Sequence, residues 1–194
     1  MSYGVAKIFP TLLFEIDCSE LLEDTLKILD GVEWRDLEVN DSSIDKFVLS
    51  EYPELSSAFD DKVNECLNGE LSYRVPMKMS TSWFTRTPTG SIVNEHKHTN
   101  SLWSSVFYFD DVSSIVFNKK QHHMIDVKFE SYDPGVIPHG HAIFPAKKGQ
   151  MILFPSDLYH WTNENEDDKY RYSLAMNFMP HGMCYDNDSS YHYQ

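Results

Sequence analysis

From residue 71 onward the chain consists of short segments rich in β-branched and aromatic residues, with turn signals between them. Strands are expected in Lys78–Arg86, Leu102–Phe109, Ser114–Phe117, Ile125–Phe129, Gln150–Phe154 and Tyr170–Met179. The turn signals are Pro88-Thr89-Gly90, Asp110-Asp111, Asn118, Asp133-Pro134-Gly135 and Lys148-Gly149. Many short strands with turns about every 8–12 residues are typical of a sandwich or barrel. This half of the chain therefore predicts a mainly β core.

The first part of the sequence predicts a short strand and a helix. Val5–Ile16 has the composition of a strand, although Pro10 interrupts it. Asp17 and Glu20 have the spacing of a capping box, and leucines at helical spacing follow them. Gly31 supplies the helix stop.

A second helix is expected over Tyr52–Leu67, where an apolar residue recurs at every fourth position. Asn68-Gly69 should end this helix, and a weak strand is expected in Trp34–Val39. The predicted layout is a single domain over residues 1–194, with a helical part (1–70), a β core (71–180) and a C-terminal tail (181–194).

Charge and cysteine content narrow the class of protein. A formal net charge of −14 makes nucleic acid an unfavourable partner, because the surface repels phosphates. Three cysteines, Cys18, Cys66 and Cys184, have no paired spacing, which favours a reducing compartment such as the cytoplasm. No apolar run approaches the ~18 residues of a membrane span, and Met1–Pro10 lacks the pattern of a signal peptide. An exposed sheet edge could allow a homodimer.

The segment Asn94–Asn100 carries the clearest chemical signal. In an extended chain residues i and i+2 share a face, so His96 and His98 point the same way. Two imidazoles on one face can form half of a transition-metal site. His160, which follows the apolar strand Gln150–Phe154, is the candidate third ligand.

The remaining histidines are weaker candidates for metal binding. His139-Gly140-His141 is a rival pair, but it lies between two prolines in a predicted loop where side-chain directions are poorly fixed. The others are expected to be structural or solvent-exposed: His122, His123, His181 and His192.

The strand that begins at Arg171 has an unusual polar face. Alternation places Arg171, Ser173, Ala175 and Asn177 on one side, and Tyr172, Leu174, Met176 and Phe178 on the other. Such a polar face suits a pocket floor where a guanidinium binds a carboxylate. It equally suits an edge strand whose polar side meets water.

Taken in order, these motifs resemble the iron(II)- and 2-oxoglutarate-dependent dioxygenases, and in particular a subfamily of marine bacteria and tailed phages. The motifs are Ser82-Trp83, Asn94-x-His96-x-His98-x-Asn100-Ser101, Ser104-Ser105-Val106-Phe107-Tyr108-Phe109, Gly149-x-x-x-Leu153-Phe154-Pro155-Ser156 with His160, and Arg171-x-Ser173-x-Ala175-x-Asn177. The resemblance covers about Met79 to Met179. It implies a double-stranded β-helix, or jelly roll, with the two N-terminal helices packed on the sheet.

The resemblance also implies roles for individual residues. His96 and His160 would be iron(II) ligands, and Arg171 with Ser173 would bind the distal carboxylate of 2-oxoglutarate. Tyr108 would hydrogen-bond the co-substrate or serve as a core aromatic. His98 stands where the family has a carboxylate, so the site holds three histidines, or two histidines with water or another group.

The expected reaction couples decarboxylation of 2-oxoglutarate, in the presence of O2, to oxidation of an unidentified substrate, with hydroxylation as the expected outcome. Trp83, Trp103 and Phe107 would form apolar pocket walls or belong to the core. Two other readings stay open: a three-histidine cupin-type dioxygenase without 2-oxoglutarate, and a metal-stabilised jelly-roll binding or virion-associated protein without turnover. A phage-encoded protein would act in the host cytoplasm.

Overall fold

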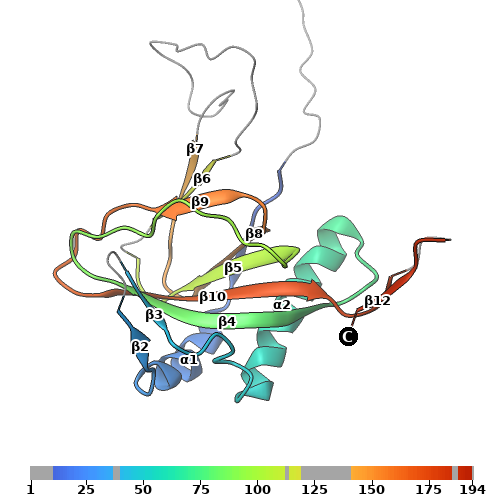
Figure 1. Cartoon of the computed structure of the whole chain (residues 1–194), viewed down its shortest axis with the longest axis horizontal. Coiled ribbons are helices and arrows are strands. Elements are labelled where there is room, and N and C mark those ends of the chain that lie inside the picture. The colour runs from blue at the N-terminus through green and yellow to red at the C-terminus, as the bar shows by residue number, and fades with distance from the viewer. Residues whose placement is uncertain (1–10, 37–39, 112–113, 119–140, 185–187, 194) are drawn as a thin grey trace, which may run out of the picture.

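The computed structural model describes residues 11–36, 40–111, 114–118, 141–184 and 188–193 (Figure 1). Its largest element is a seven-stranded antiparallel sheet in the order β1-β8-β5-β10-β4-β3-β2. The strands of this major sheet are β1 (Phe14–Asp17), β2 (Trp34–Arg35), β3 (Asp41–Ser43), β4 (Met77–Thr87), β5 (Trp103–Tyr108), β8 (Gln150–Pro155) and β10 (Arg171–Pro180). A smaller sheet has the order β7-β6-β9, with β6 (Ser114–Asn118), β7 (His141–Pro145) and β9 (Tyr159–Thr162). The chain is therefore mainly β, as predicted.

Helices cover one face of the major sheet, and the smaller sheet lies against the other (Figure 1). The helical elements are η1 (Ser19–Leu21), α1 (Leu22–Leu29) and α2 (Pro53–Leu71), and a separate hairpin pairs β11 (Gly182–Cys184) with β12 (Tyr191–Tyr193). None of the helices in the described ranges is long and apolar enough to span a bilayer.

Strand alternation divides the apolar residues between two cores. On β5, Phe107 packs toward the helices, whereas Tyr108 packs between the two sheets. On β8, Leu153 and Phe154 divide in the same way. The two antiparallel sheets thus enclose a core of their own, which is the arrangement of a jelly roll, and the predicted fold class is confirmed.

A break in the pairing of β10 with β4 sets which β4 side chains face the smaller sheet. Asn177 is opposite Thr81, but Phe178 is opposite Met79, so Ser80 has no partner in the register. A bulge of this kind reverses the alternation along the strand. As a result Trp83 faces the smaller sheet, whereas Met79 packs toward the helices.

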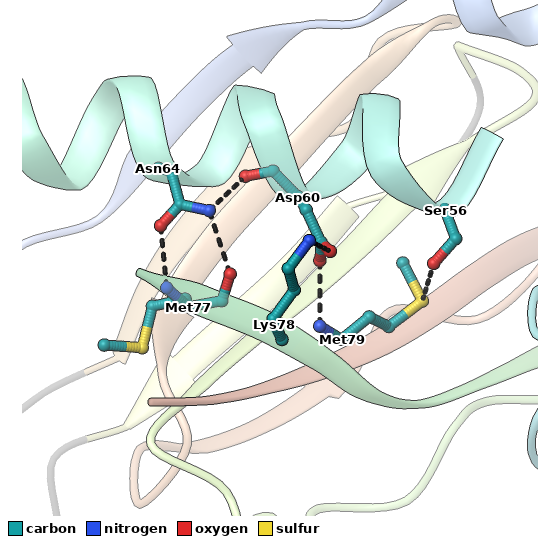
Figure 2. A network of polar contacts seen from close by, with 6 residues as sticks. All are labelled: Ser56, Asp60, Asn64, Met77, Lys78 and Met79. Atoms are coloured by element: carbon teal, nitrogen blue, oxygen red, sulfur yellow. Dashed lines mark hydrogen bonds and ion pairs between the residues drawn. The ribbon is translucent and has the colours of Figure 1, made fainter. Parts of the chain in front are cut away.

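Helix α2 is joined to β4 by side chains that take the place of a neighbouring strand (Figure 2). Asp60 accepts the Met79 N–H at 2.8 Å, and Asn64 both accepts the Met77 N–H and donates to the Met77 carbonyl. Lys78 forms a 3.0 Å ion pair with Asp60. Asp60 and Asn64 are one helical turn apart on α2. They therefore supply hydrogen-bond partners for the backbone of two alternate residues of β4, Met77 and Met79.

Both predicted helices form, but their ends differ from the prediction. Asp17 accepts the Ser19 N–H at 3.0 Å, whereas Glu20 pairs with Lys62 on α2 instead of closing a capping box. Helix α2 continues past Asn68-Gly69, and Ser72 ends it in a left-handed conformation with φ 55°. Nothing lies within 4 Å of a Cβ built on Gly69, and its φ is not in the left-handed region, so this position does not require a glycine and the helix continues through it.

Some expected strands are shorter or lie outside the described residues. Of Val5–Ile16 the structure describes β1, and of Trp34–Val39 it describes β2. Ile125–Phe129 and His139 lie outside the described residues. The sequence predicts a loop between Pro138 and Pro145. This prediction is wrong for its described part, because His141–Pro145 form β7.

Candidate metal centre and adjoining pocket

A cavity of about 440 Å³ lies between the two sheets. Its floor is built from rows of side chains across the major sheet. In one row Ser42, Thr85, Ser173 and Tyr108 follow each other across β3, β4, β10 and β5. In the next, Trp83 on β4 is opposite Ala175 on β10. Of the polar face predicted for the Arg171 strand, Arg171, Ser173 and Ala175 line the pocket, and the edge-strand reading is wrong because β4 and β5 flank β10.

Three histidines meet at the edge of this cavity. Their candidate ligand atoms all lie within 4.8 Å of one another, in the only such group of three metal-ligating side chains among the described residues: His96, His98 and His160. The ring centroids of His96 and His160 are 4.3 Å apart, and that of His98 is 5.1 Å from each. Exposed Glu95 and Lys97 alternate with the half-buried His96 and His98, as the period of an extended chain predicts.

Backbone carbonyls fix the tautomers of two of these rings. Nδ1 of His96 lies 2.7 Å from the Asn94 carbonyl, and Nδ1 of His160 lies 2.9 Å from the Leu158 carbonyl. A carbonyl can only accept, so each Nδ1 carries the proton and each Nε2 keeps a lone pair for a metal.

Burial keeps two of the imidazoles neutral. It lowers the pKa of His98 to about 4 and that of His160 to about 3, and a charge on His96 adds to both effects. Neutral imidazole is the form that binds metals, so at neutral pH these rings need not lose a proton to act as ligands.

A buried network of hydroxyl groups holds the backbone of the His98 segment. The His98 N–H donates to the Ser156 carbonyl at 2.9 Å. The Ser156 hydroxyl lies 2.8 Å from that of Ser104 and donates to Ser101 at 2.9 Å, and Ser104 donates to Asn177. Several motif residues from separate strands therefore support the position of one candidate ligand.

Arg171 lies deep in the cavity and is 5% exposed. Its guanidinium donates to the Asn163 carbonyl at 2.9 Å and to the Thr162 hydroxyl at 2.6 Å, both neutral acceptors. Burial lowers its pKa, and Asp110 opposes this shift, yet an arginine stays protonated at physiological pH. A buried cation with neutral partners is a strong site for an anion.

Tyr108 places its hydroxyl near this cation without a partner. The oxygen is buried and makes no hydrogen bond in the described part of the protein. Burial raises the pKa of Tyr108, although Arg171 acts in the opposite direction, so the phenol is neutral and can donate. An unsatisfied buried hydroxyl costs about 1–3 kcal/mol, and a bound acceptor would remove that cost.

The expected apolar walls are only partly in the pocket. Trp83 lines it, with its ring centroid 5.4 Å from that of His98. Trp103 and Phe107 do not, because they project toward the helices and belong to the core there. His141 is exposed and lies against Trp161, while His181 and His192 are also exposed.

The sequence did not single out the hydroxyl and amide groups that line the rest of the cavity: Asn40, Ser42, Thr85, Thr87 and Thr162. Period-two alternation in β4 could have indicated Thr85 and Thr87 once Trp83 was placed. Nothing local marked Ser42 or Thr162, because each reaches the cavity through pairing with a distant strand.

Comparisons with known proteins identify the family of the chain. A family model described as "Putative 2OG-Fe(II) oxygenase" matches residues 81–177, half of the 194-residue chain. The chain belongs to this family of 2OG-Fe(II) oxygenases. It is therefore an iron(II)- and 2-oxoglutarate-dependent oxygenase, and the predicted cofactors are those of its family. Among curated proteins no sequence matches it.

Solved structures of other 2OG-Fe(II) oxygenases share the fold of this one at low sequence identity. An oxidoreductase of the family from Burkholderia pseudomallei is 11% identical, with TM-score 0.63 and coverage of 87% of this chain and 84% of that one. HygX from Streptomyces hygroscopicus, solved with nickel and 2-oxoglutarate, is 13% identical, with TM-score 0.62 and coverage of 88% and 83%. A prolyl-4-hydroxylase from Pseudomonas putida is 12% identical, with TM-score 0.56 and coverage of 88% and 93%.

Proposed function

We propose that His96, His98 and His160 hold the iron(II) of this oxygenase, and that Arg171, Tyr108 and Ser173 bind the distal carboxylate of 2-oxoglutarate. One observation carries the proposal: three imidazoles and a buried guanidinium, whose hydrogen-bond acceptors among the described residues are neutral, line the same cavity. Imidazole suits iron, and a guanidinium suits a carboxylate.

The ligand set is proposed to be three histidines. Among the residues that the structure describes, the lining of the cavity contains no acidic side chain beside the imidazoles. Three neutral ligands leave iron(II) with its full double charge, one unit more than two histidines with a carboxylate would. The extra positive charge favours binding of 2-oxoglutarate, which is a dianion.

The co-substrate would lie between the metal and Arg171. Its distal carboxylate would accept from the guanidinium and from the orphaned Tyr108 hydroxyl, with Ser173 beside them in the same row of the sheet. The Arg171 guanidinium and the Tyr108 hydroxyl are buried without their full set of hydrogen bonds, which costs free energy in the empty protein. The contacts with the carboxylate remove this cost and so favour the bound state.

When bound, iron(II) with 2-oxoglutarate and O2 supplies oxidation of a C–H bond, with succinate and carbon dioxide as co-products. The residues of the chain orient the co-substrate and keep the site dry. Phe154 and Phe117 pack their rings 4.7 and 6.0 Å from that of His160 and shield it from water. A water-excluded site strengthens each polar contact inside it.

The other enzyme left open by the sequence, a three-histidine oxygenase without 2-oxoglutarate, is favoured by His98 in the ligand group but not by the family of the chain. It also leaves Arg171 and the Tyr108 hydroxyl without a ligand. Release of succinate in step with O2 uptake separates the two candidates, and it separates both from a binding protein without turnover. The experiment is anaerobic loading with iron(II) and 2-oxoglutarate, followed by addition of O2.

Succinate released in step with O2 uptake is the expected result. Consumption of O2 with no succinate would reject the 2-oxoglutarate role. We further propose that the chain acts as one domain, that hydroxylation is the outcome, that the protein is cytoplasmic, and that an exposed sheet edge allows a homodimer. The single sheet formed by strands from both halves supports the first of these.

A further inference from the structure

The cavity extends beyond the site proposed for 2-oxoglutarate, across the major sheet from β10 over β4 to β3. Ser42 and Ser173 lie in the same row of the floor and are separated by β4. Neighbouring strands are ~4.8 Å apart, so these two residues are ~10 Å from each other. The end of the cavity over β3 and β4 is therefore available to the substrate that is oxidised, while 2-oxoglutarate occupies the end over β5 and β10.

A lysine ammonium stands at the rim of this second end. Nζ of Lys46 donates to the Ser42 hydroxyl, and it lies 5.9 Å from the centroid of the Trp83 ring. Both Ser42 and Trp83 line the cavity, so the ammonium is held between two of its wall residues.

The backbone around Lys46 is fixed to β4. The Lys46 carbonyl accepts the Ser82 N–H at 2.9 Å, and the Ser82 carbonyl accepts the Val48 N–H at 3.1 Å. The Ser82 hydroxyl also accepts the Leu49 N–H at 2.9 Å. Because Ser82 precedes Trp83 on β4, these bonds hold the lysine beside the indole ring.

The positive charge of Lys46 is poorly compensated. No carboxylate forms an ion pair with it within 4.0 Å in the described part of the chain. Burial and the neighbouring charge of Arg35 lower the pKa of Lys46, and Asp45 opposes them only in part. In a chain of net charge −14, a half-buried ammonium that bonds a hydroxyl instead of a carboxylate marks a place for an anion.

We propose that the substrate oxidised by this enzyme is a small anionic molecule, whose acidic group binds Lys46 while its apolar part lies against Trp83. The Trp83 ring is 5.4 Å from that of His98, so a molecule held in this way extends toward the metal centre. The inference rests on the proposed function, because it assigns the remaining end of the same cavity.

Benzoate and benzamide form a matched pair of probes that have the same ring and differ in charge. Each is titrated by calorimetry into protein loaded with nickel(II) and saturating 2-oxoglutarate, which cannot turn over. We expect benzoate to bind at least tenfold more tightly than benzamide. Lys46→Met should remove this preference, whereas Lys46→Arg should keep it. Lys27→Met removes an equivalent charge from α1, on the opposite side of the major sheet, and should change nothing.

Equal binding of the two probes to the wild-type protein would overturn the inference, and so would a preference for benzoate that survives in Lys46→Met. The loading steps test the proposed function separately. If nickel(II) or 2-oxoglutarate fails to bind, the metal and co-substrate assignments are wrong, and benzoate titrated into metal-free Arg171→Met, with and without Lys46→Met, still decides the role of Lys46.

Discussion

His96 and His160 are joined by two reciprocal backbone hydrogen bonds, in which the N–H of each donates to the carbonyl of the other at 2.9 and 2.8 Å. This antiparallel bridge attaches the segment with two of the histidines to β9, which carries the third. Because directly opposite residues in such a pair project to the same face, both imidazoles point into the cavity. The proposed metal centre is thus set by main-chain pairing as well as by side-chain chemistry.

The first prediction concerns the ligand set. His96→Ala, His98→Ala and His160→Ala should each weaken iron(II) binding by more than about 100-fold, since even loss of groups behind the ligands costs about 10–100-fold. His141→Ala is the matched control and should bind iron(II) as the wild type does, because this ring lies against Trp161. Competition with a metal-sensitive dye measures the affinities. Undiminished affinity in His98→Ala would leave two histidines as the protein ligands.

Replacement of Arg171 should affect the co-substrate and spare the metal. A hydrogen bond to a charged group contributes about 1.5–3 kcal/mol, so Arg171→Met should weaken 2-oxoglutarate binding about 10- to 150-fold. Arg171→Lys should recover little of this loss, because an ammonium lacks the planar fork of the guanidinium. Calorimetric titration of the nickel(II) protein gives both dissociation constants. Unchanged 2-oxoglutarate affinity in Arg171→Met would reject this role.

Tyr108→Phe should have opposite effects on stability and on binding. Removing an unsatisfied buried hydroxyl should stabilise the ligand-free protein by about 1 kcal/mol, while losing a donor to the carboxylate should weaken 2-oxoglutarate binding about tenfold. Urea unfolding and calorimetry measure the two effects. A variant that loses stability and keeps its affinity would show that Tyr108 is only a core residue.

Stability of the metal-free protein should fall as the pH is lowered below about 6.5. The folded pKa values of about 4 for His98 and about 3 for His160 lie below the ordinary histidine value, so below pH 6.5 the unfolded chain binds more protons than the folded one. The contribution of these rings is complete above pH 6.5 and is lost as the pH falls toward 4 and 3.

Urea unfolding at pH 7.5, 6.0 and 5.0 measures this dependence. His160→Phe removes the more deeply buried of the two rings and should have a shallower slope of unfolding free energy against pH. His192→Phe, at an exposed position on β12, should keep the slope of the wild type. A wild-type stability that is flat from pH 7.5 to 5.0 would contradict neutral burial of the two histidines.

The sequence by itself determined which side chains share one face of a strand, because this depends only on the local period of the chain. Alternation along β10 correctly divided Arg171 and Ser173 from Leu174 and Met176, because neighbouring side chains of a strand must point to opposite faces. The same rule paired His96 with His98. Chain order and strand composition were enough to predict a mainly β fold with two helices.

Only the tertiary structure decided what depends on pairing between distant segments. Trp83 faces the smaller sheet because of the bulge at Ser80, and Trp103 is buried because the helices cover its side of the sheet. No local pattern encodes either feature. Ser42 and Lys46 are placed at the cavity because their segments pair with β4, and Thr162 because β9 pairs with β6; each partner is far away in sequence. Register between strands is set by long-range packing, and a shift of one residue would turn every one of these side chains to the other face.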